Sequence, residues 1–182
     1  IFLGLNLLEG LDQTLDYFYM VDSYGGVLPE ELREIVKLLK SKTKVSLGFH
    51  GHDNMHMGLI NSIVALEEGC EIIDATITGM GRGAGNLKTE LLLTYLESAG
   101  KIKPDFGMLG NTVARFEEMK REYNWGTSLP YMFSGANSLP QKEVMDWVGM
   151  NRYSLNSILN ALNNKKLIVE DNVKLPILQK NT

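Results

Sequence analysis

The sequence predicts an α/β fold built on a parallel sheet, and two observations carry this prediction. Short apolar stretches of strand length alternate with segments of helical periodicity, at a spacing of about 25 to 30 residues. Each apolar stretch also runs into a polar or glycine-rich loop before the next helix. Parallel sheets carry their chemistry at the carboxyl ends of the strands, so candidate functional residues are expected in these loops.

The first two strands are expected at residues 1–7 and 17–21, because both stretches are apolar and of strand length. The second stretch ends in the turn Asp22-Ser23-Tyr24-Gly25-Gly26. The connection over residues 8–16 is short, because a parallel crossover normally takes a dozen or more residues. Either its helix is reduced to a turn, or further residues once stood there.

A helix is expected to begin at Pro29, since proline is favoured in the first turn. Acidic residues follow it directly and lysines gather near residues 37–42, which matches the helix dipole at both ends. The next strand, residues 45–49, runs into His50-Gly51-His52 and a helix over residues 57–68, which Gly69 ends.

The third unit has a strand at residues 71–77, a glycine-rich loop at 78–86 and a helix at 87–98. Further along the chain, helices are expected at residues 109–123, 141–148 and 154–162, the last capped by Ser154. No clear eighth strand follows. The sequence therefore divides into a barrel-type α/β domain over residues 1–125 and a helical extension or cap over 126–182.

Composition describes a soluble globular chain: 182 residues, 44% hydrophobic and 22% charged, with a net charge of −4. No stripe of basic residues stands out, so nucleic acid is not an expected partner. No apolar run approaches the roughly 20 residues that cross a bilayer, so no membrane is expected either. The single cysteine, Cys70, fits a reducing cytoplasm and is expected to be a small core residue.

His50 and His52 are the candidate metal ligands. Side chains two apart on a strand point to the same side, so both imidazoles can reach one cation from a rigid element. The alternative is that both are polar loop residues satisfied by water. His56, four residues beyond His52, is a weaker candidate that could face the same metal from the first helical turn.

The loop Gly79-Met80-Gly81-Arg82-Gly83-Ala84-Gly85-Asn86 invites two interpretations. Its backbone N–H groups could hold an anion, although neither a P-loop ending nor the dinucleotide fingerprint is present. The better physical interpretation is that glycines let the backbone pass close to a neighbouring loop. Asn86 would then stand at the helix start with its side-chain oxygen free to face the site.

The segments Gly48-Phe49-His50-Gly51-His52-Asp53-Asn54, Asn61 to Cys70 and Asp74 to Asn86 resemble a family of metal-dependent aldolases and lyases. The family includes hydroxymethylglutaryl-CoA lyase and isopropylmalate synthase, and the likeness is greatest to the 4-hydroxy-2-oxovalerate aldolase branch. It covers roughly residues 17–96, and the combination of His-x-His with Gly-x-Gly-x-Gly-x-Gly-Asn is specific.

The resemblance implies a (β/α)8 TIM barrel, of which this chain is the C-terminal portion. It implies a divalent metal, Mn or Mg, held by His50 and His52 with Asn86 on or beside it, and Ser23 in the substrate pocket. The activity implied is cleavage or formation of a carbon-carbon bond of a small 4-hydroxy-2-oxo acid, with pyruvate and an aldehyde as products. Helices after the barrel meet a partner dehydrogenase or another subunit in the resembling aldolases, which makes a homo-oligomer the expectation.

The chain departs from the family pattern at two points of the site. The Arg-Asp-Gly motif of the first family strand is absent, so the third metal ligand and the catalytic arginine are expected upstream of residue 1. The late tyrosine that handles the proton of the substrate hydroxyl has no clear match, and Tyr131 is the nearest candidate. Two alternatives therefore stay open: a Claisen-type acyl-CoA lyase or condensing enzyme on the same barrel, and an inactive relative that serves as a scaffold.

Overall fold

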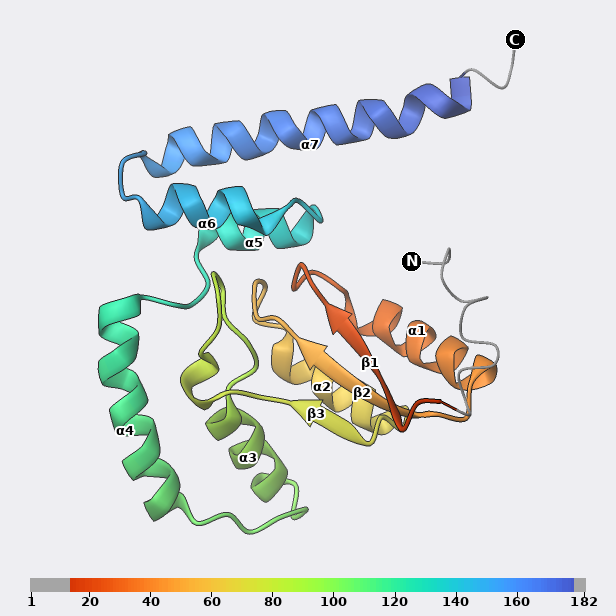
Figure 1. Ribbon diagram of the computed structural model, residues 1–182, viewed down its shortest axis with the longest axis vertical. Helices are drawn as coiled ribbons and strands as arrows, with labels where there is room; N and C mark the ends of the chain where they lie inside the picture. Colours follow the sequence, from red (N-terminus) through yellow and green to blue (C-terminus); the bar gives the residue numbers. More distant parts are fainter. Residues whose placement is uncertain (1–13, 179–182) are drawn as a thin grey trace.

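The computed structural model describes the backbone of residues 14–178 and the side chains as far as residue 167 (Figure 1). Within this part, three parallel strands form one sheet in the order β1-β2-β3: β1 (Tyr17–Asp22), β2 (Ser46–Gly51) and β3 (Ile72–Asp74). The strand predicted at residues 1–7 and most of the short connection after it lie outside the described residues.

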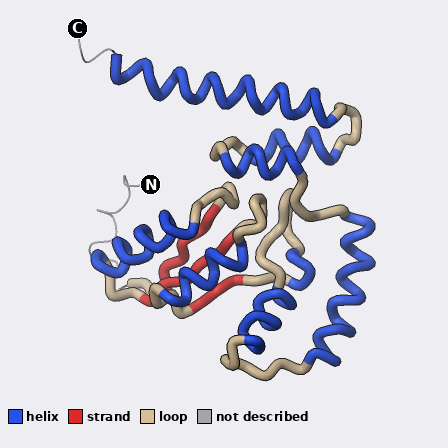
Figure 2. The backbone as a smooth tube through the Cα atoms, turned by 180° about the vertical axis from the view of Figure 1, so that it is seen from behind, coloured by secondary structure: helices blue, strands red, loops and turns tan. Residues whose placement is uncertain are grey.

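Two helices cover one face of the sheet, as the view from behind shows (Figure 2). They are α1 (Pro29–Lys42) and α2 (Gly58–Glu67), which lie close to the predicted boundaries. Pro29 begins α1, and Gly69, at a positive φ of 89°, follows the end of α2, as expected for a helix stop. The core between helices and sheet consists of Leu32, Val36, Leu39, Leu47, Phe49, Val64, Ala65 and Cys70.

The opposite face of the sheet carries no helix in the described part of the chain (Figure 1). Side chains alternate along a strand, so Phe18 and Met20 of β1 pack toward the helices while Tyr17, Tyr19 and Val21 are exposed. A Cβ added to Gly48 would meet the Tyr19 ring, which therefore lies across Gly48 on the open face. The same alternation places His50 on this face.

The third unit differs from its prediction. β3 has three residues instead of the expected stretch 71–77, and a short 3-10 turn occupies Ile77–Gly79. Helix α3 (Thr89–Ser98) begins later than predicted because Lys88 still has extended backbone, φ −78° and ψ 127°. The residues between β3 and α3 instead make single bridges, Thr76 with Lys88 and His52 with Asn86.

Four helices follow, and no strand occurs after β3 among the described residues. They are α4 (Phe106–Tyr123), α5 (Leu129–Ala136), α6 (Gln141–Gly149) and α7 (Leu155–Leu178). The sequence prediction missed α5 and placed the end of α7 too early. The predicted cap of α7 is confirmed, since Ser154 Oγ accepts a hydrogen bond from the Ser157 N–H at 3.2 Å.

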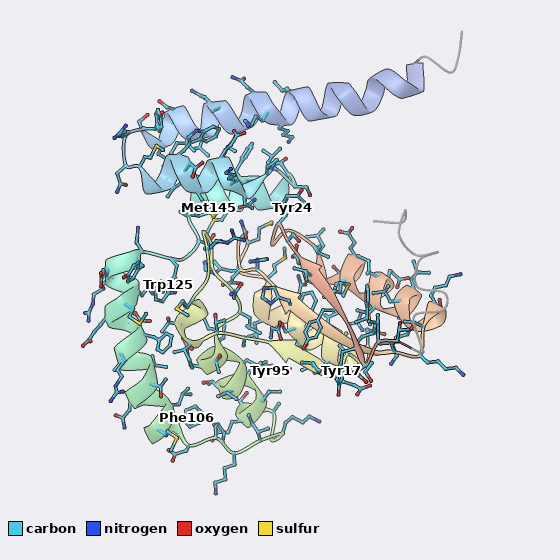
Figure 3. All side chains as sticks on the ribbon, in the orientation of Figure 1. Tyr17, Tyr24, Tyr95, Phe106, Trp125 and Met145 are labelled. Atoms are coloured by element: carbon cyan, nitrogen blue, oxygen red, sulfur yellow. The ribbon has the colours of Figure 1, made fainter. Side chains whose placement is uncertain are left out.

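Helices α5, α6 and α7 pack on one another around a second core that is separate from the core beneath the sheet. This core contains Tyr131, Leu139, Val144, Ile158 and Leu162, together with Ala84 from the glycine loop. Figure 3 shows Met145 of α6 next to the tip of that loop, where a Cβ on Gly83 would be 3.2 Å from the Met145 sulfur. The division of the chain into residues 1–125 and 126–182 stays a prediction.

Candidate functional site

The two predicted metal ligands lie together at the carboxyl end of β2. The ring centroids of His50 and His52 are 5.0 Å apart, with an angle of 79° between the ring planes. His50 is the penultimate residue of β2, and His52 follows the strand with the same side-chain parity. The structure therefore brings both imidazoles to one side of the sheet.

Each ring is held by a hydrogen bond at its Nδ1 atom. His50 Nδ1 lies 3.0 Å from a carboxylate oxygen of Asp74, and His52 Nδ1 lies 2.8 Å from the backbone carbonyl oxygen of Asp22. Both oxygens accept hydrogen bonds, so a neutral imidazole carries its proton on Nδ1 and keeps a lone pair on Nε2. Neither Nε2 atom has a hydrogen-bond partner among the described residues.

Asn86 is brought to this region by the glycine loop. Its backbone bridges His52, and the Asp53 N–H donates to the Gly85 carbonyl at 3.0 Å, which ties the loop to the histidine segment. Asn86 is not at a helix start as predicted, since α3 begins at Thr89. Its side-chain nitrogen donates to the Met80 carbonyl at 3.0 Å, while its Oδ1 atom is buried and has no partner among the described residues.

The glycines of the loop serve close backbone approach, as the sequence suggested. A Cβ on Gly85, whose φ is 80°, would overlap the carbonyl oxygen of Gly79. The Asn86 N–H donates to that same carbonyl at 3.0 Å, so the loop closes on itself. As a result, residues 85–88 run back toward the carboxyl end of β2.

These donors fit a divalent metal ion. Imidazoles that bind a metal through Nε2 almost always donate Nδ1–H to a carboxylate or a backbone carbonyl, which is the arrangement found at both histidines. The buried, unpartnered Oδ1 of Asn86 is a third neutral donor. Within the described residues, no three side chains of His, Cys, Asp or Glu gather closely enough to hold a metal.

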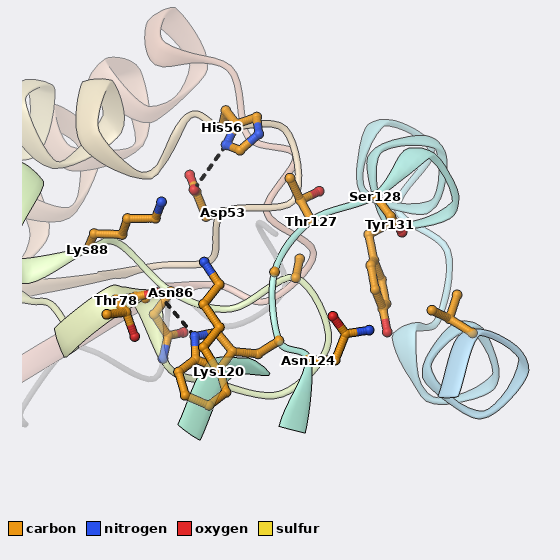
Figure 4. A pocket seen from close by; sticks show the side chains of 15 residues that line it. Asp53, His56, Thr78, Asn86, Lys88, Lys120, Asn124, Thr127, Ser128 and Tyr131 are labelled. Carbon is orange, nitrogen blue, oxygen red and sulfur yellow. Dashed lines mark hydrogen bonds and ion pairs between the residues drawn. The ribbon is translucent and has the colours of Figure 1, made fainter. Parts of the chain in front are cut away.

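Tyr131 lies on α5 with its side chain buried, and burial raises the pKa of its hydroxyl. It shares a cavity of about 310 Å³ with Asn86 (Figure 4). His50 and His52 do not line this cavity, so the structure brings Tyr131 to Asn86 but not to the histidine pair.

Ser23 is exposed in the turn after β1 and lines a different cavity, of about 390 Å³, together with Asp22 and Ser138. It is therefore not in the cavity of Asn86. His56 is not in the first turn of α2, because its φ is 57° and the helix begins at Gly58. Its Nδ1 atom pairs with the carboxylate of Asp53 at 3.2 Å, and its side chain is 64% exposed.

Sequence reasoning missed the two groups that orient the histidines. Asp74 ends β3 and pairs with His50 in the register of the sheet. The Asp22 carboxylate accepts the Gly26 and Val27 N–H groups at 3.2 and 3.1 Å, which holds the turn that presents its carbonyl to His52. An acid at the end of the strand after His-x-His was a signal that could have indicated Asp74.

Comparison with known proteins identifies relatives for about half of the chain. It is 45% identical over 85 residues to a 4-hydroxy-2-oxovalerate aldolase of Geobacillus stearothermophilus, a match that covers 47% of this chain and 25% of that protein. It is 42% identical over 84 residues to an oxaloacetate decarboxylase of Mycobacterium tuberculosis, with 46% and 25% covered. The match thus spans about a quarter of the length of these curated relatives.

Solved structures with a similar fold include the "N-terminal domain of a putative aldolase from Bacteroides vulgatus". Its TM-score is 0.80 at 54% sequence identity, and the match covers 88% of this chain and 53% of that one. The carboxyl transferase domain of Rhizobium etli pyruvate carboxylase, solved with pyruvate, has a TM-score of 0.65 at 16% identity, with 81% and 26% covered. At that identity, the likeness concerns the fold alone.

A sequence profile described as HMGL-like matches residues 12–114. The matched region contains all three described strands and both the histidine pair and the glycine loop. Because this match covers more than half of the chain, the chain belongs to the HMGL-like family, and its three strands and their helices are a part of the TIM barrel of that family.

Proposed function

We propose that the protein is a carbon-carbon lyase of the aldolase type, which cleaves a small 4-hydroxy-2-oxo acid to pyruvate and an aldehyde with a divalent metal, Mn or Mg. The observation that carries the proposal is the pair of anchored imidazoles. Both Nδ1 atoms are engaged, both Nε2 lone pairs are available, and the rings are 5.0 Å apart. The relatives named as aldolases support the choice of reaction.

In this proposal His50, His52 and Asn86 hold the metal through two nitrogens and one amide oxygen. A bound divalent metal supplies Lewis-acid stabilisation of the negative charge that develops on the 2-oxo group as the carbon-carbon bond breaks. Asp74 and the Asp22 carbonyl keep the rings in one tautomer and one orientation. Because the two rings are already oriented, their side chains lose little conformational entropy when the metal binds.

The cleavage also requires movement of two protons. The 4-hydroxyl group loses its proton as it becomes the aldehyde carbonyl, and the carbon next to the 2-oxo group gains one to give the methyl group of pyruvate. Tyr131 is the candidate for the first transfer. Because burial raises its pKa, it is neutral at ordinary pH and would relay the proton rather than act as a standing base.

A second candidate function is decarboxylation of a 2-oxo acid. The relative named oxaloacetate decarboxylase favours it, because loss of carbon dioxide leaves the same kind of negative charge next to a 2-oxo group. The two candidates differ in the fragment that departs. Release of an aldehyde supports the aldolase, and release of carbon dioxide from oxaloacetate supports the decarboxylase.

The test measures Mn²⁺ binding by calorimetry and pyruvate release from 4-hydroxy-2-oxopentanoate by a coupled lactate dehydrogenase assay. His50→Ala should weaken Mn²⁺ binding by at least about 100-fold and abolish pyruvate release, because loss of an orienting partner alone costs about 10- to 100-fold. Asn111→Ala, an exposed change on α4, is the control and should alter neither. Pyruvate release that survives His50→Ala would contradict the proposal.

A further inference from the structure

The cavity next to Asn86 is assembled from five separate parts of the chain. They are the loop after β2, the segment from the glycine loop to Lys88, the end of α4, the start of α5 and Val148 of α6 (Figure 4). Its volume of about 310 Å³ is at the lower end of the range for small-molecule sites, roughly 300 to 1,000 Å³. A ligand there would have to be small.

Two lysines from different elements line this cavity. Lys88 precedes α3 and Lys120 lies in the last turn of α4, and Figure 4 shows both side chains reaching toward the middle of the cavity. Neither lysine forms an ion pair with a residue that the structure describes. Two half-buried ammonium groups directed into one small space repel each other unless an anion lies between them.

The acid at the cavity wall does not neutralise these lysines. The carboxylate of Asp53 accepts the Gly58 N–H at 3.0 Å through one oxygen and pairs with His56 Nδ1 at 3.2 Å through the other. Both oxygens of this carboxylate therefore interact with residues at the start of α2 and just before it, and not with the lysines. The lysines keep their donors for a ligand.

A hydroxyl group in the cavity wall also lacks a partner. Ser128 is the residue before α5, but its side chain makes no cap hydrogen bond, and its Oγ atom is buried with no partner among the described residues. Serine at this position normally accepts from the first backbone N–H groups of the helix. Here the hydroxyl is left as a donor to the cavity, beside the positive end of the α5 dipole.

Three residues of the cavity wall have strained backbone. His56, Thr78 and Asn124 have φ values of 57°, 54° and 53°, in the left-handed region. For Thr78 this is a true outlier, because its side chain is branched at Cβ. Its conformation is held by the Glu90 carboxylate, which accepts its N–H at 3.0 Å, and by the Trp125 indole, which donates to its carbonyl at 3.1 Å. Strain of this kind concentrates at ligand sites.

We infer that this cavity binds an anionic group, a carboxylate or a phosphate monoester, at the end of the substrate remote from the 2-oxo acid. The inference rests on the proposed function, because Asn86 connects the cavity to the metal-binding residues. Lys88 and Lys120 supply the charge, and the Ser128 hydroxyl supplies a hydrogen bond. The substrate would then be a 4-hydroxy-2-oxo acid that carries a second negative charge on its aldehyde half.

Trp125 reports directly on occupation of the cavity, since its buried indole lines the wall. The first experiment titrates inorganic phosphate, and separately acetate, into the full chain with Trp147→Phe, at constant ionic strength, and follows indole fluorescence. We expect a saturable change with at least one anion. Lys88→Met and Lys120→Met should each weaken the affinity for the anion by about tenfold or more, because each removes one charge-assisted hydrogen bond.

Two variants control this titration. Lys88→Arg keeps the charge and should retain binding within a few fold, whereas Lys101→Met removes an exposed lysine outside the cavity and should change nothing. Lack of saturation relative to sodium chloride, or equal weakening by Lys101→Met, would overturn the inference. Stronger binding of phosphate than acetate assigns the group as a phosphate monoester, and the reverse order assigns it as a carboxylate.

The second experiment separates this inference from the proposed function. Pyruvate release is compared for 4-hydroxy-2-oxopentanoate and for the analogue with a carboxylate at its far end. Lys120→Met should raise KM about tenfold or more for the dicarboxylate analogue and leave KM for 4-hydroxy-2-oxopentanoate, which lacks the second carboxylate, unchanged. Turnover of 4-hydroxy-2-oxopentanoate, with no change in KM for the dicarboxylate analogue in Lys120→Met, would overturn the inference alone. Saturable phosphate binding without pyruvate release from either substrate would sink the aldolase proposal but keep an anion site.

Discussion

At the scale of single residues, the histidine pair depends on groups that are far away in sequence. Asp74 reaches His50 across the sheet from β3, and the Asp22 carbonyl reaches His52 from the end of β1. The Asp74 side chain is 43% exposed, so its charge is partly screened by water. Its effect on the site should therefore come mainly from orienting the ring.

Asp74→Ala should weaken Mn²⁺ binding by about 10- to 100-fold, which is the range for loss of an orienting partner of a metal ligand. The Mn²⁺ affinity of Asp74→Asn should lie between those of Asp74→Ala and the unmodified chain, because the amide oxygen still accepts a hydrogen bond from His50 Nδ1–H. Calorimetric titration with Mn²⁺ measures both. The matched control is Asp146→Ala, an exposed acid on α6. Equal affinities of Asp74→Ala and the control would show that Asp74 does not orient the ligand.

Tyr131 should make the stability of the protein sensitive to alkaline pH. Burial raises the pKa of its hydroxyl above about 10, the value expected in the unfolded chain. Above that pH the unfolded state releases the proton first, so the free energy of unfolding should fall as pH rises. Urea unfolding at about pH 8 and pH 10.5 should show a smaller fall for Tyr131→Phe. Tyr153→Phe, whose hydroxyl is exposed, should behave as the unmodified chain does.

At the scale of elements, the helices that cover the sheet were the most predictable feature. Helix α1 carries Leu32, Val36 and Leu39 at helical spacing, and all three side chains are buried. Its start at Pro29 and its charged ends agreed with the prediction. Helix α5 was missed because it is short and contains proline and glycine, so its apolar residues give no clear period.

Leu32→Ala should lower the free energy of unfolding by about 2 to 5 kcal/mol, since Leu32 is fully buried and its loss leaves a cavity between α1 and the sheet. Leu91→Ala removes the same atoms from a side chain on α3 that is 43% exposed, and should cost much less. Urea unfolding monitored by circular dichroism checks both. Equal losses for the two variants would mean that the described core does not set the stability.

At the scale of the whole molecule, Asn54 connects the helical layer to the strand ends. Its side-chain nitrogen donates to the Tyr131 carbonyl at 3.1 Å and to the Gln141 side chain at 2.9 Å. The backbone carbonyl of Asn54 accepts a hydrogen bond from the Thr127 hydroxyl. Asn54 is two residues beyond His52, so this buried side chain is one of the contacts that position α5 relative to the histidine pair, together with the Gly126 N–H, which donates to the Gly83 carbonyl at 3.0 Å.

Asn54→Ala should reduce stability by about 1 to 3 kcal/mol, because it removes two buried hydrogen bonds and leaves the acceptors on α5 and α6 to share the Ser134 hydroxyl. The effect should also be local. Hydrogen exchange should accelerate in α5 and α6 while the amides of β2 stay protected. Asn111→Ala, on the exposed side of α4, is the control and should stay within about 0.5 kcal/mol. Uniform acceleration across the sheet would show that Asn54 supports the whole molecule instead.

The described chain contains no helix with the length and apolar composition needed to cross a bilayer. Its sheet has one face covered by α1 and α2 and one face open, with Tyr17, Tyr19 and Val21 exposed on β1. The histidine pair stands at the edge of this open face.

The features that could be predicted from the sequence are those that depend on residues close together in the chain. The alternation of strands and helices, the glycine stop after α2 and the pairing of His50 with His52 follow from local periodicity and backbone preference, and the structure agrees with each. The lengths of β3 and α5 could not be read in this way. They depend on packing partners that the local pattern does not contain.

The amino-acid sequence by itself determined the parallel βα arrangement, the histidine pair and the family pattern, because each is written in spacings of a few residues. Only the tertiary structure decided which groups surround these residues. Asp74, the Asp22 carbonyl and the two cavity lysines meet the site from other elements, since hydrogen bonds and charges act through space over a few ångströms, whatever their separation along the chain.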